Sequence, residues 1–215
     1  GTDCVEPRGV LGLGTVVDAQ EPLPSIKHIR RNGVGVRVMG YPIDELEIDM
    51  SDELNRLSFV DAAPDAGLPG VAESQHVAAR GTCNYDFGII QGGFIGTRLR
   101  CERATRVYLI FDEVRERPPE KVFTLGVGAV ALDLEPGEYS FETLEPYSFR
   151  YLRVLSLQAP VEVDALWVRE YVNPVAELQS PSDDPELAAI FQAGRQTFRT
   201  NSVDLFTDCM SRERG

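Results

Sequence analysis

Tyr139–Leu144 reads YSFETL, an alternation of apolar and polar side chains with a period of two. Successive side chains of a strand point to opposite faces, so this period predicts a strand with one buried and one solvated face. The preceding segment Glu135–Glu138 contains a Pro-Gly pair and has the composition of a turn. A strand with one solvated face is typical of antiparallel sheets, and the stretch therefore indicates an antiparallel β fold.

Further segments of strand length lie on both sides of that stretch. They alternate or run apolar, and Pro- and Gly-rich breaks at residues 63–70 and 117–119 fit loops. The predicted strands are Val34–Met39, Thr105–Phe111, Ala129–Leu134, Tyr151–Leu157 and Val161–Val172. Residues 1–172 are therefore predicted to form an antiparallel β-sandwich with a jelly-roll-like arrangement.

The pattern changes from strands to a helix after Asn173. Asp184 is a good N-cap because its carboxylate can accept the free N–H groups of the first turn, and Pro185 suits the first helical position. Apolar residues then recur at helical spacing at Leu187, Ile190, Phe191, Gly194 and Phe198. The sequence predicts a linker over 173–183 and one main helix from Asp184 to about Asn201. Its apolar stripe is expected to pack on the sandwich, on missing helices of a larger domain or on a second chain, or else the segment frays after about Asn201. Docking on the sandwich or self-association is favoured over a bare helix.

The composition limits the classes of function. The chain has 215 residues, 43% of them hydrophobic, which suits one large or two modest domains with a real core. Its net charge of −13 argues against binding to nucleic acid or to an anionic membrane, because both are polyanions. No apolar run reaches about 18 residues, so no membrane-spanning helix is predicted. The first residue is Gly1 rather than Met, which indicates processing or a longer parent.

Metal and cofactor sites have few candidates in the sequence. The four cysteines, at positions 4, 83, 101 and 209, form no C-x-x-C pair, and the only histidines are His28 and His76. The acidic run from Asp44 to Glu53 lacks the glycine and ligand spacing of a calcium loop, and a solvated strand and turn is preferred. Gly-rich segments such as 92–96 lack the spacing of a dinucleotide loop. No metal and no cofactor is therefore predicted.

The last eight residues, Asp208–Gly215, read DCMSRERG and combine two carboxylates with two arginines. Asp208 and Glu213 are five positions apart. Paired carboxylates are what the cleavage of a glycosidic bond requires, but a solvated salt-bridge cluster has the same composition. Spacing alone favours the solvated cluster.

This octapeptide resembles the Asp-Cys-Pro-Ser-Arg-Glu-Arg-Ala/Gly signature of bacterial α-L-rhamnosidases, which are inverting glycoside hydrolases. Further pieces resemble segments of the same family, in the same order along the chain. They are Tyr85–Gly88, Gly92–Phe94 with Arg98 and Leu99, Tyr147–Val154, and Ser182–Leu187 with Thr197, Asn201 and Asp204. Together they cover roughly residues 84–215, whereas residues 1–80 resemble nothing that we can name.

The resemblance implies a β-sandwich followed by the start of a catalytic (α/α)6 barrel, with 184–215 as the first helix and signature loop of a truncated barrel. Glu213 matches the family's general acid, and Asp208 matches a carboxylate that holds sugar hydroxyls. Arg212 and Arg214 match basic neighbours by residue type. The family's general base comes from much further along its barrel, so this chain alone is expected to be inactive. The substrate implied for the parent enzyme is a terminal α-L-rhamnoside, so its partner is a rhamnose-containing glycoside.

Elementary chemistry supports these roles only in part. Five residues of an ideal helix turn through about 500°, so Asp208 and Glu213 converge only if the segment is a loop. Arg212 and Arg214 favour the ionised form of a neighbouring carboxyl, whereas a general acid needs a raised pKa. Met210 stands where the family usually has proline, which bears on the shape of the loop. Inversion also requires a second carboxylate about 6.5–9.5 Å away to activate water.

Two other classes of function stay open. One is a non-catalytic carbohydrate-binding sandwich that uses exposed aromatic side chains from among Trp167, Tyr171, Phe94 and Tyr85. Trp167 lies in an alternating strand and is expected in the core. The other class is a structural module between domains. The apolar stripe of the helix also allows self-association in each of these classes.

Overall fold

The computed structural model describes residues 3–20, 53–61, 73–114, 128–173 and 182–202. Ten strands and one long helix fall within this part of the chain. The strands are β1 (Cys4–Val5), β2 (Gly9–Asp18), β3 (Leu57–Asp61), β4 (Gln75–Val77), β5 (Gly81–Cys101), β6 (Thr105–Asp112), β7 (Ala129–Leu134), β8 (Gly137–Glu142), β9 (Tyr147–Ser156) and β10 (Val161–Glu170). The helix α3 spans Pro185–Asn201. No helix of the described residues is both long and apolar enough to cross a membrane.

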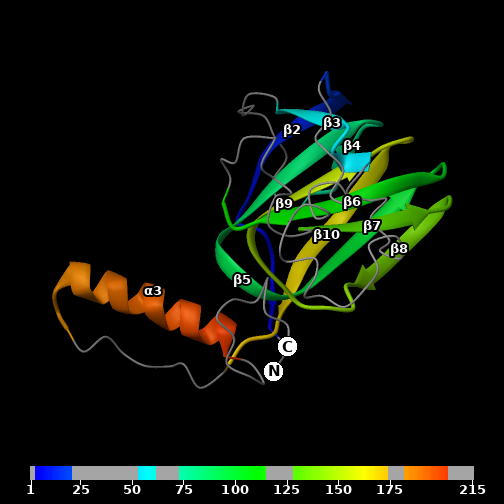
Figure 1. The fold of residues 1–215 in the computed structure, drawn as a ribbon. Coiled ribbons are helices and arrows are strands. Elements are labelled where there is room, and N and C mark those ends of the chain that lie inside the picture. Colours follow the sequence, from blue (N-terminus) through cyan, green and yellow to red (C-terminus); the bar gives the residue numbers. More distant parts are fainter. Residues whose placement is uncertain (1–2, 21–52, 62–72, 115–127, 174–181, 203–215) are drawn as a thin grey trace, which may run out of the picture.

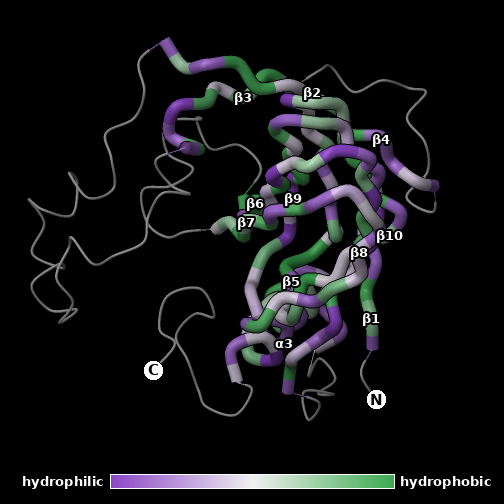
Figure 2. Tube along the Cα trace, turned by 90° about the vertical axis from the view of Figure 1, so that its right-hand side faces the viewer, coloured by the Kyte–Doolittle hydropathy of each residue, from purple (hydrophilic) through white to green (hydrophobic). Residues whose placement is uncertain are grey.

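The strands pair antiparallel throughout and form one continuous sheet that folds over on itself. The long strand β5 belongs to both layers. Its first part, Gly81–Asp86, pairs with β2 and β9, while its last part, Gly93–Cys101, pairs with β10 and β8. Figure 2 shows the two layers, with β6, β7 and β9 on one side and β4, β8 and β10 on the other. The prediction of a mainly β, antiparallel sandwich with one C-terminal helix is confirmed.

The bend of β5 lies between Asp86 and Gln91, where its pairing with β9 is interrupted. Gly88 has a φ of +84°, a left-handed conformation that side chains with a Cβ rarely adopt. A Cβ at this position would also lie 2.3 Å from the Cδ of Arg8. Glycine is therefore the residue that lets one strand pass from one layer to the other.

The main core fills the space between the two layers. Its aromatic centre is Phe149, whose ring meets Phe87 edge-on at 5.3 Å and Phe111 at 5.5 Å between centroids. Buried aliphatic side chains surround these rings, and the largest of them are Ile95, Leu99, Leu109 and Leu152. Along β6 the residues 107, 109 and 111 face this core, as the alternation of the predicted strand requires.

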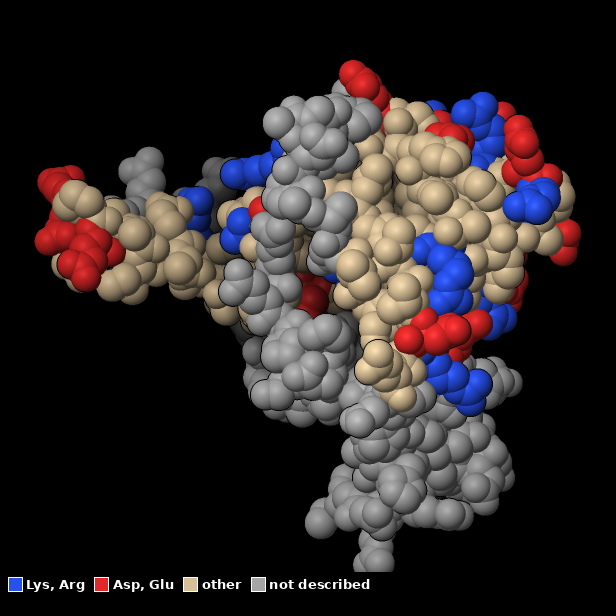
Figure 3. Space-filling view, turned by 90° about the horizontal axis from the view of Figure 1, so that it is seen from above, with Lys and Arg blue, Asp and Glu red and all other residues tan. Residues whose placement is uncertain are grey.

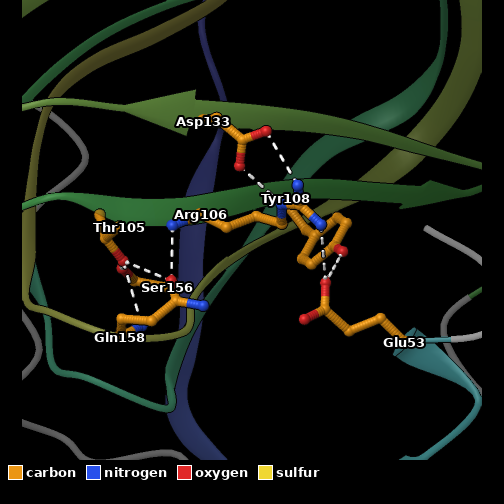
Figure 4. A network of polar contacts seen from close by, with 7 residues as sticks. All are labelled: Glu53, Thr105, Arg106, Tyr108, Asp133, Ser156 and Gln158. Atoms are coloured by element: carbon orange, nitrogen blue, oxygen red, sulfur yellow. Dashed lines mark hydrogen bonds and ion pairs between the residues drawn. The ribbon is translucent and has the colours of Figure 1, made fainter. Parts of the chain in front are cut away.

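A second, smaller core covers the opposite face of β6. Tyr108 and Ile110 point into it, together with Val16, Leu54, Ala129 and Leu155. The Glu53 carboxylate accepts a hydrogen bond from the Tyr108 hydroxyl and lies 3.3 Å from an Arg106 Nη1 (Figure 4). Arg106 in turn pairs with Asp133 through two hydrogen bonds of 2.6 and 2.9 Å. These polar contacts fasten the residues that follow position 52 to the outside of the sheet.

The helix α3 begins as the sequence predicts. The Asp184 Oδ1 accepts hydrogen bonds from the backbone N–H groups of Glu186 and Leu187 at 2.9 and 3.3 Å. Figure 1 shows the helix extending away from the sandwich, so that only its C-terminal end reaches the strands. The acidic side chains near its start gather at the far end of the molecule (Figure 3).

The apolar stripe of α3 stays uncovered by the sandwich. Leu187, Ile190 and Phe198 are 54%, 63% and 48% exposed. Docking of the stripe on the sandwich, one of the arrangements expected from the sequence, therefore does not occur among the described residues. Packing on other helices and packing on a second chain stay predictions.

The strand predictions agree with the structure where it describes them. Thr105–Phe111 falls within β6, and Ala129–Leu134 coincides with β7. The alternating stretch Tyr139–Leu144 belongs to β8, which starts two residues earlier and ends at Glu142. Leu144 lies past the strand and is 97% exposed. The predicted strand Val34–Met39 lies outside the described residues.

Candidate functional site

The signature residues Asp208, Arg212, Glu213 and Arg214 lie outside the described residues. The described part ends at Ser202, six positions before Asp208. Their roles therefore stay predictions. The structure does describe the other pieces that carry the resemblance, and it shows which of them meet.

Two of these pieces meet at the bend of β5. The Asp86 carboxylate accepts hydrogen bonds of 2.8 and 2.9 Å from Nε and Nη2 of Arg150, on β9. Its Oδ1 also accepts the Gly88 N–H at 2.6 Å. The carboxylate raises the pKa of the Arg150 guanidinium, chiefly through these hydrogen bonds. The aromatic residues that precede Gly88 and Arg150, Phe87 and Phe149, form the edge-on pair of the core.

This arrangement assigns the Asp86 carboxylate a structural role. Both of its oxygens accept hydrogen bonds from Arg150, and a backbone N–H shares one of them, so the group is committed to the bend. A general acid or base needs an oxygen free to exchange a proton with substrate. The segment Tyr85–Gly88 therefore has a structural role at the bend of β5.

A row of side chains crosses the outer face of the second layer. Trp167 on β10 and Glu142 on β8 are both register partners of Gly96 on β5. The Trp167 Nε1–H donates to Oε1 of Glu142 at 2.9 Å, and the Arg169 Nε donates to Oε2 at 2.7 Å. These contacts lower the pKa of Glu142, with the hydrogen bond from Trp167 as the largest cause.

Two more aromatic residues extend the same face. The Arg169 guanidinium lies over the Phe94 ring, 4.3 Å from its centroid, and the Phe94 and Tyr171 rings are 5.7 Å apart. The expectation that Trp167 lies in the core is wrong, because its side chain is partly exposed on this outer face. The expectation that Tyr85 is an exposed aromatic residue is also wrong, because Tyr85 lies in the main core and is only 2% exposed.

The register explains why the sequence misplaces Trp167. The pairing of β10 with β5 shifts between Val163 and Ala165, so the alternation along β10 changes phase there. Val161, Val163, Leu166 and Val168 are the buried residues, and Trp167 falls on the outside. Gly96 is the residue in the sequence that could have indicated the outward position of Trp167. A Cβ at that position would lie 2.0 Å from the Trp167 Cε2, so the ring needs a glycine beneath it.

The helix α3 joins the sandwich through a small polar contact. The Glu170 carboxylate at the end of β10 accepts two hydrogen bonds from the Arg199 guanidinium, at 3.0 and 2.8 Å. The Asn173 N–H donates to the Arg199 carbonyl at 2.9 Å, and the Gln196 Nε2 donates to the Ile90 carbonyl at 3.0 Å. We call Glu170, Asn173 and Arg199 the helix clamp. It fixes the end of the helix that precedes the signature.

Two observations bear on thiol and metal chemistry in the part of the chain that the structure describes. Burial raises the pKa of the Cys83 thiol to about 11, so it is protonated and unreactive near neutral pH. The described ranges contain no group of three or more His, Cys, Asp and Glu side chains that could hold a metal ion. Most of the acidic run Asp44–Glu53 lies outside those ranges.

Neither a protein-family model nor a curated protein sequence matches this chain. Its fold, however, is similar to that of two solved rhamnosidases. A GH78 family rhamnosidase of Bacillus sp. GL1 matches with a TM-score of 0.60 and 22% identity, over 73% of this chain and 18% of its own. A rhamnosidase from Klebsiella oxytoca, with rhamnose bound, matches with a TM-score of 0.60 and 14% identity, over 100% of this chain and 38% of its own.

These comparisons bear on the fold. At identities of 22% and 14% they show that this chain has the architecture of β-sandwich regions in rhamnosidases. The chain spans only 18% and 38% of the lengths of those two proteins. What the whole of such a protein would catalyse is therefore a matter of proposal.

Proposed function

We propose that this chain is the accessory sandwich and the first catalytic helix of an inverting glycoside hydrolase that cleaves terminal α-L-rhamnosides. In this proposal residues 1–172 form the sandwich, 173–183 the linker, and 184–215 the first helix and signature loop of an (α/α)6 barrel. The observation that carries it is the fold similarity with the Klebsiella oxytoca rhamnosidase, which extends over 100% of this chain, helix included.

The spatial order of the resembling pieces supports the same proposal. Tyr85–Gly88 and Tyr147–Val154 are far apart in sequence, yet Asp86 and Arg150 form an ion pair of 2.8 Å. The helix clamp then holds Arg199, nine positions before Asp208. A fixed helix end limits where the following loop can run. The sandwich thus acts as the base from which the first catalytic segment starts.

The proposed chemistry divides the work between two carboxyl groups. Glu213 protonates the departing glycosidic oxygen, while a base outside this chain activates water on the opposite face of the sugar. Asp208 accepts hydrogen bonds from sugar hydroxyls, and Arg212 and Arg214 supply nearby positive charge. A general acid must be protonated at the working pH, so Glu213 needs burial or further carboxylates to offset both arginines. Those groups belong to a completed barrel.

The test compares substrates with different leaving groups in the complete enzyme. Glu213→Gln removes the acid, so kcat for an alkyl α-L-rhamnoside is expected to fall by about 10²–10⁴-fold. The 4-nitrophenyl α-L-rhamnoside should lose less, since its leaving group departs with little protonation. The matched control is Glu186→Gln, which makes the same substitution at the exposed start of α3. NMR of the first product should show the β-anomer of rhamnose, as inversion requires.

Three results would each contradict a different part of this proposal. Equal activity of Glu213→Gln and the unmodified enzyme removes Glu213 from the acid role. An equal loss for both leaving groups indicates a binding or folding role for Glu213. Absence of hydrolysis of either rhamnoside by the unmodified complete enzyme rejects the enzyme function itself.

A further inference from the structure

The outer face of β8, β5 and β10 presents two adjacent rows of side chains. The first row is Glu142, Gly96 and Trp167, and the second is Ser140, Arg98 and Ala165. Register partners in antiparallel strands share a face, and residues two apart on one strand do so as well. Trp167 and Arg98 therefore lie on the same side of the sheet, in neighbouring rows.

The indole of Trp167 is held flat on this face. It lies against Gly96, where even one Cβ would come within 2.1 Å of Nε1. Its Nε1–H is fixed by Glu142 on the strand beyond, so the ring extends across β5. One flat side of the ring therefore meets the backbone, and the other faces away from the sheet. A rigid, one-sided aromatic surface of this kind loses little entropy when a ligand packs on it.

Arg98 differs from the other arginines of this face. Arg169 is paired with Glu142 at 2.7 Å, and Arg100 lies 3.8 Å from Asp164. Arg98 is exposed and has no ion pair or hydrogen bond among the residues that the structure describes. Its register partners Ser140 and Ala165 are small, which leaves space beside the guanidinium.

The two groups together suit one chemical class of ligand. The apolar C–H face of a pyranose ring packs on an indole, as do other flat apolar surfaces. A guanidinium pairs with a carboxylate through two parallel hydrogen bonds. The two rows are separated by about 6.8 Å along the strand, within reach of a pyranose and the carboxylate attached to it. The net charge of −13 repels an anionic ligand at long range, so only the local charge of Arg98, which has no ion pair among the described residues, favours a carboxylate at this place.

We propose that Trp167 and Arg98 form a binding surface for a uronic-acid residue of an acidic glycan, separate from the proposed catalytic segment. The ring stacks on the indole and its carboxylate pairs with Arg98. Glu142 orients the indole and makes no contact with the sugar. The inference does not depend on the rhamnosidase proposal, because binding is measured on this chain alone without any hydrolysis.

Trp167 is the only tryptophan of the chain, so intrinsic fluorescence reports on this surface directly. The probe is an α-1,4-linked trimer of D-galacturonic acid, and its fully methyl-esterified form is the neutral control of the same shape. The acidic trimer is expected to give a saturable change in emission and to protect Trp167 from acrylamide quenching. The methyl ester should bind at least about tenfold more weakly, because it lacks the ion pair with Arg98. Added salt should weaken the binding of the acidic trimer and leave the binding of the methyl ester unchanged.

Two variants with the same charge change separate the ion pair from general attraction. Arg98→Gln should weaken binding of the acidic trimer about tenfold or more and leave the methyl ester unaffected. Arg103→Gln, in the exposed turn between β5 and β6, should leave both unaffected. Arg98 is exposed, so its replacement preserves the core, and equal melting temperatures of both variants check this. Gly96→Ala should displace the indole and weaken both ligands.

Each contrary result overturns the proposal in a definite way. A folded chain whose fluorescence responds to neither trimer has no such glycan surface. Equal binding of trimer and methyl ester shows a neutral-sugar surface and removes the role of Arg98. Equal losses in Arg98→Gln and Arg103→Gln show non-specific attraction. Trp167 could instead be protected from acrylamide without any sugar, and only at protein concentrations at which the chain dimerises. That result would show that a second copy of the chain covers this surface.

Discussion

The apolar side chains of the sandwich are buried, whereas those of the helix α3 are largely exposed. In the sandwich, Phe87, Phe149 and Leu99 have no exposed surface. On α3, Leu187 and Ile190 are more than half exposed, although they recur with equal regularity. Periodicity thus identifies a face that needs burial, but it does not say what buries it. The sandwich supplies its own partner through its second layer, whereas the described residues supply none for the stripe of α3.

The attachment of α3 follows from the same difference. Its hydrogen bonds with the sandwich lie toward its C-terminal end, at Arg199 and Gln196. An isolated helix of 17 residues is only marginally stable in water, so α3 depends on this contact and on whatever covers its stripe. A helix held at one end and uncovered along its side is consistent with the first helix of a larger helical layer, as proposed above.

The largest expected effect is in the sandwich core. Phe149→Ala removes the ring that contacts both Phe87 and Phe111 and should lower the free energy of unfolding by about 3–5 kcal/mol. Urea unfolding followed by Trp167 fluorescence measures it. Phe198→Ala on α3 is the matched control and should cost less than about 1 kcal/mol, because its ring is 48% exposed. Similar losses in both variants would show that the stripe of α3 is buried in solution.

Glycine-to-alanine substitutions should have opposite effects on stability in the sandwich and in α3. Gly88→Ala places a Cβ at a positive φ and against Arg8, so it should destabilise the sandwich by about 1–3 kcal/mol. Gly194→Ala adds a Cβ to open space in the middle of α3 and should stabilise the helix by about 0.5–1 kcal/mol. Thermal melting measures the first change and helical circular dichroism the second. A loss of helix signal in Gly194→Ala would mean that this side of α3 is packed closely.

Loosening the helix clamp should free α3 and leave the sandwich unaffected. Arg199→Met removes both hydrogen bonds to Glu170, whose side chain is only 11% exposed. Because Arg199 is itself about one third exposed, the local loss should be about 1 kcal/mol. Limited proteolysis should then cleave within 185–201 faster, at an unchanged melting temperature of the sandwich. Gln192→Met, at an exposed position of the same helix, is the control. A lowered melting temperature would show that the clamp supports the whole fold.

The smallest expected effect is the pH dependence carried by Glu142. Its folded pKa is lowered by the Trp167 N–H and by Arg169, so its stabilising contribution is present at neutral pH. This contribution is lost as the pH falls below about 4 and the carboxyl becomes protonated. Glu142→Gln should therefore flatten the acid limb of stability against pH, measured by urea unfolding at several pH values. Glu138→Gln, on the same strand and exposed, should leave that limb unchanged.

Local patterns in the sequence predicted much of the fold. Alternation located β6 and β7, and the Asp184-Pro185 cap located the start of α3, because each signal depends on neighbouring residues. The pairing of Asp86 with Arg150, 64 positions apart, depends on the register between β5 and β9, which no local pattern encodes. The bend of β5 at Gly88 was missed for the same reason, since a 21-residue strand belongs to two layers.

The same distinction between local sequence patterns and long-range register applies to the candidate sites. The position of Trp167 could not be predicted because a register shift between Val163 and Ala165 reverses the phase of the alternation. Arg98 attracts notice only when its small neighbours across the sheet are known. The roles of Asp208 and Glu213 rest on the resemblance of the signature, and they stay predictions until the proposed parent enzyme is assayed.

Hydrogen exchange tests the contrast between sandwich and helix most directly. In this chain, proven monomeric, the amides of β5 and β9 should exchange slowly, whereas those of residues 186–196 in α3 should exchange orders of magnitude faster. In the proposed parent enzyme, whose further helices would cover the stripe, the same α3 amides should become as protected as the strands. Protection of α3 equal to that of the strands in the monomeric chain, or fast exchange of α3 in both proteins, would contradict the account.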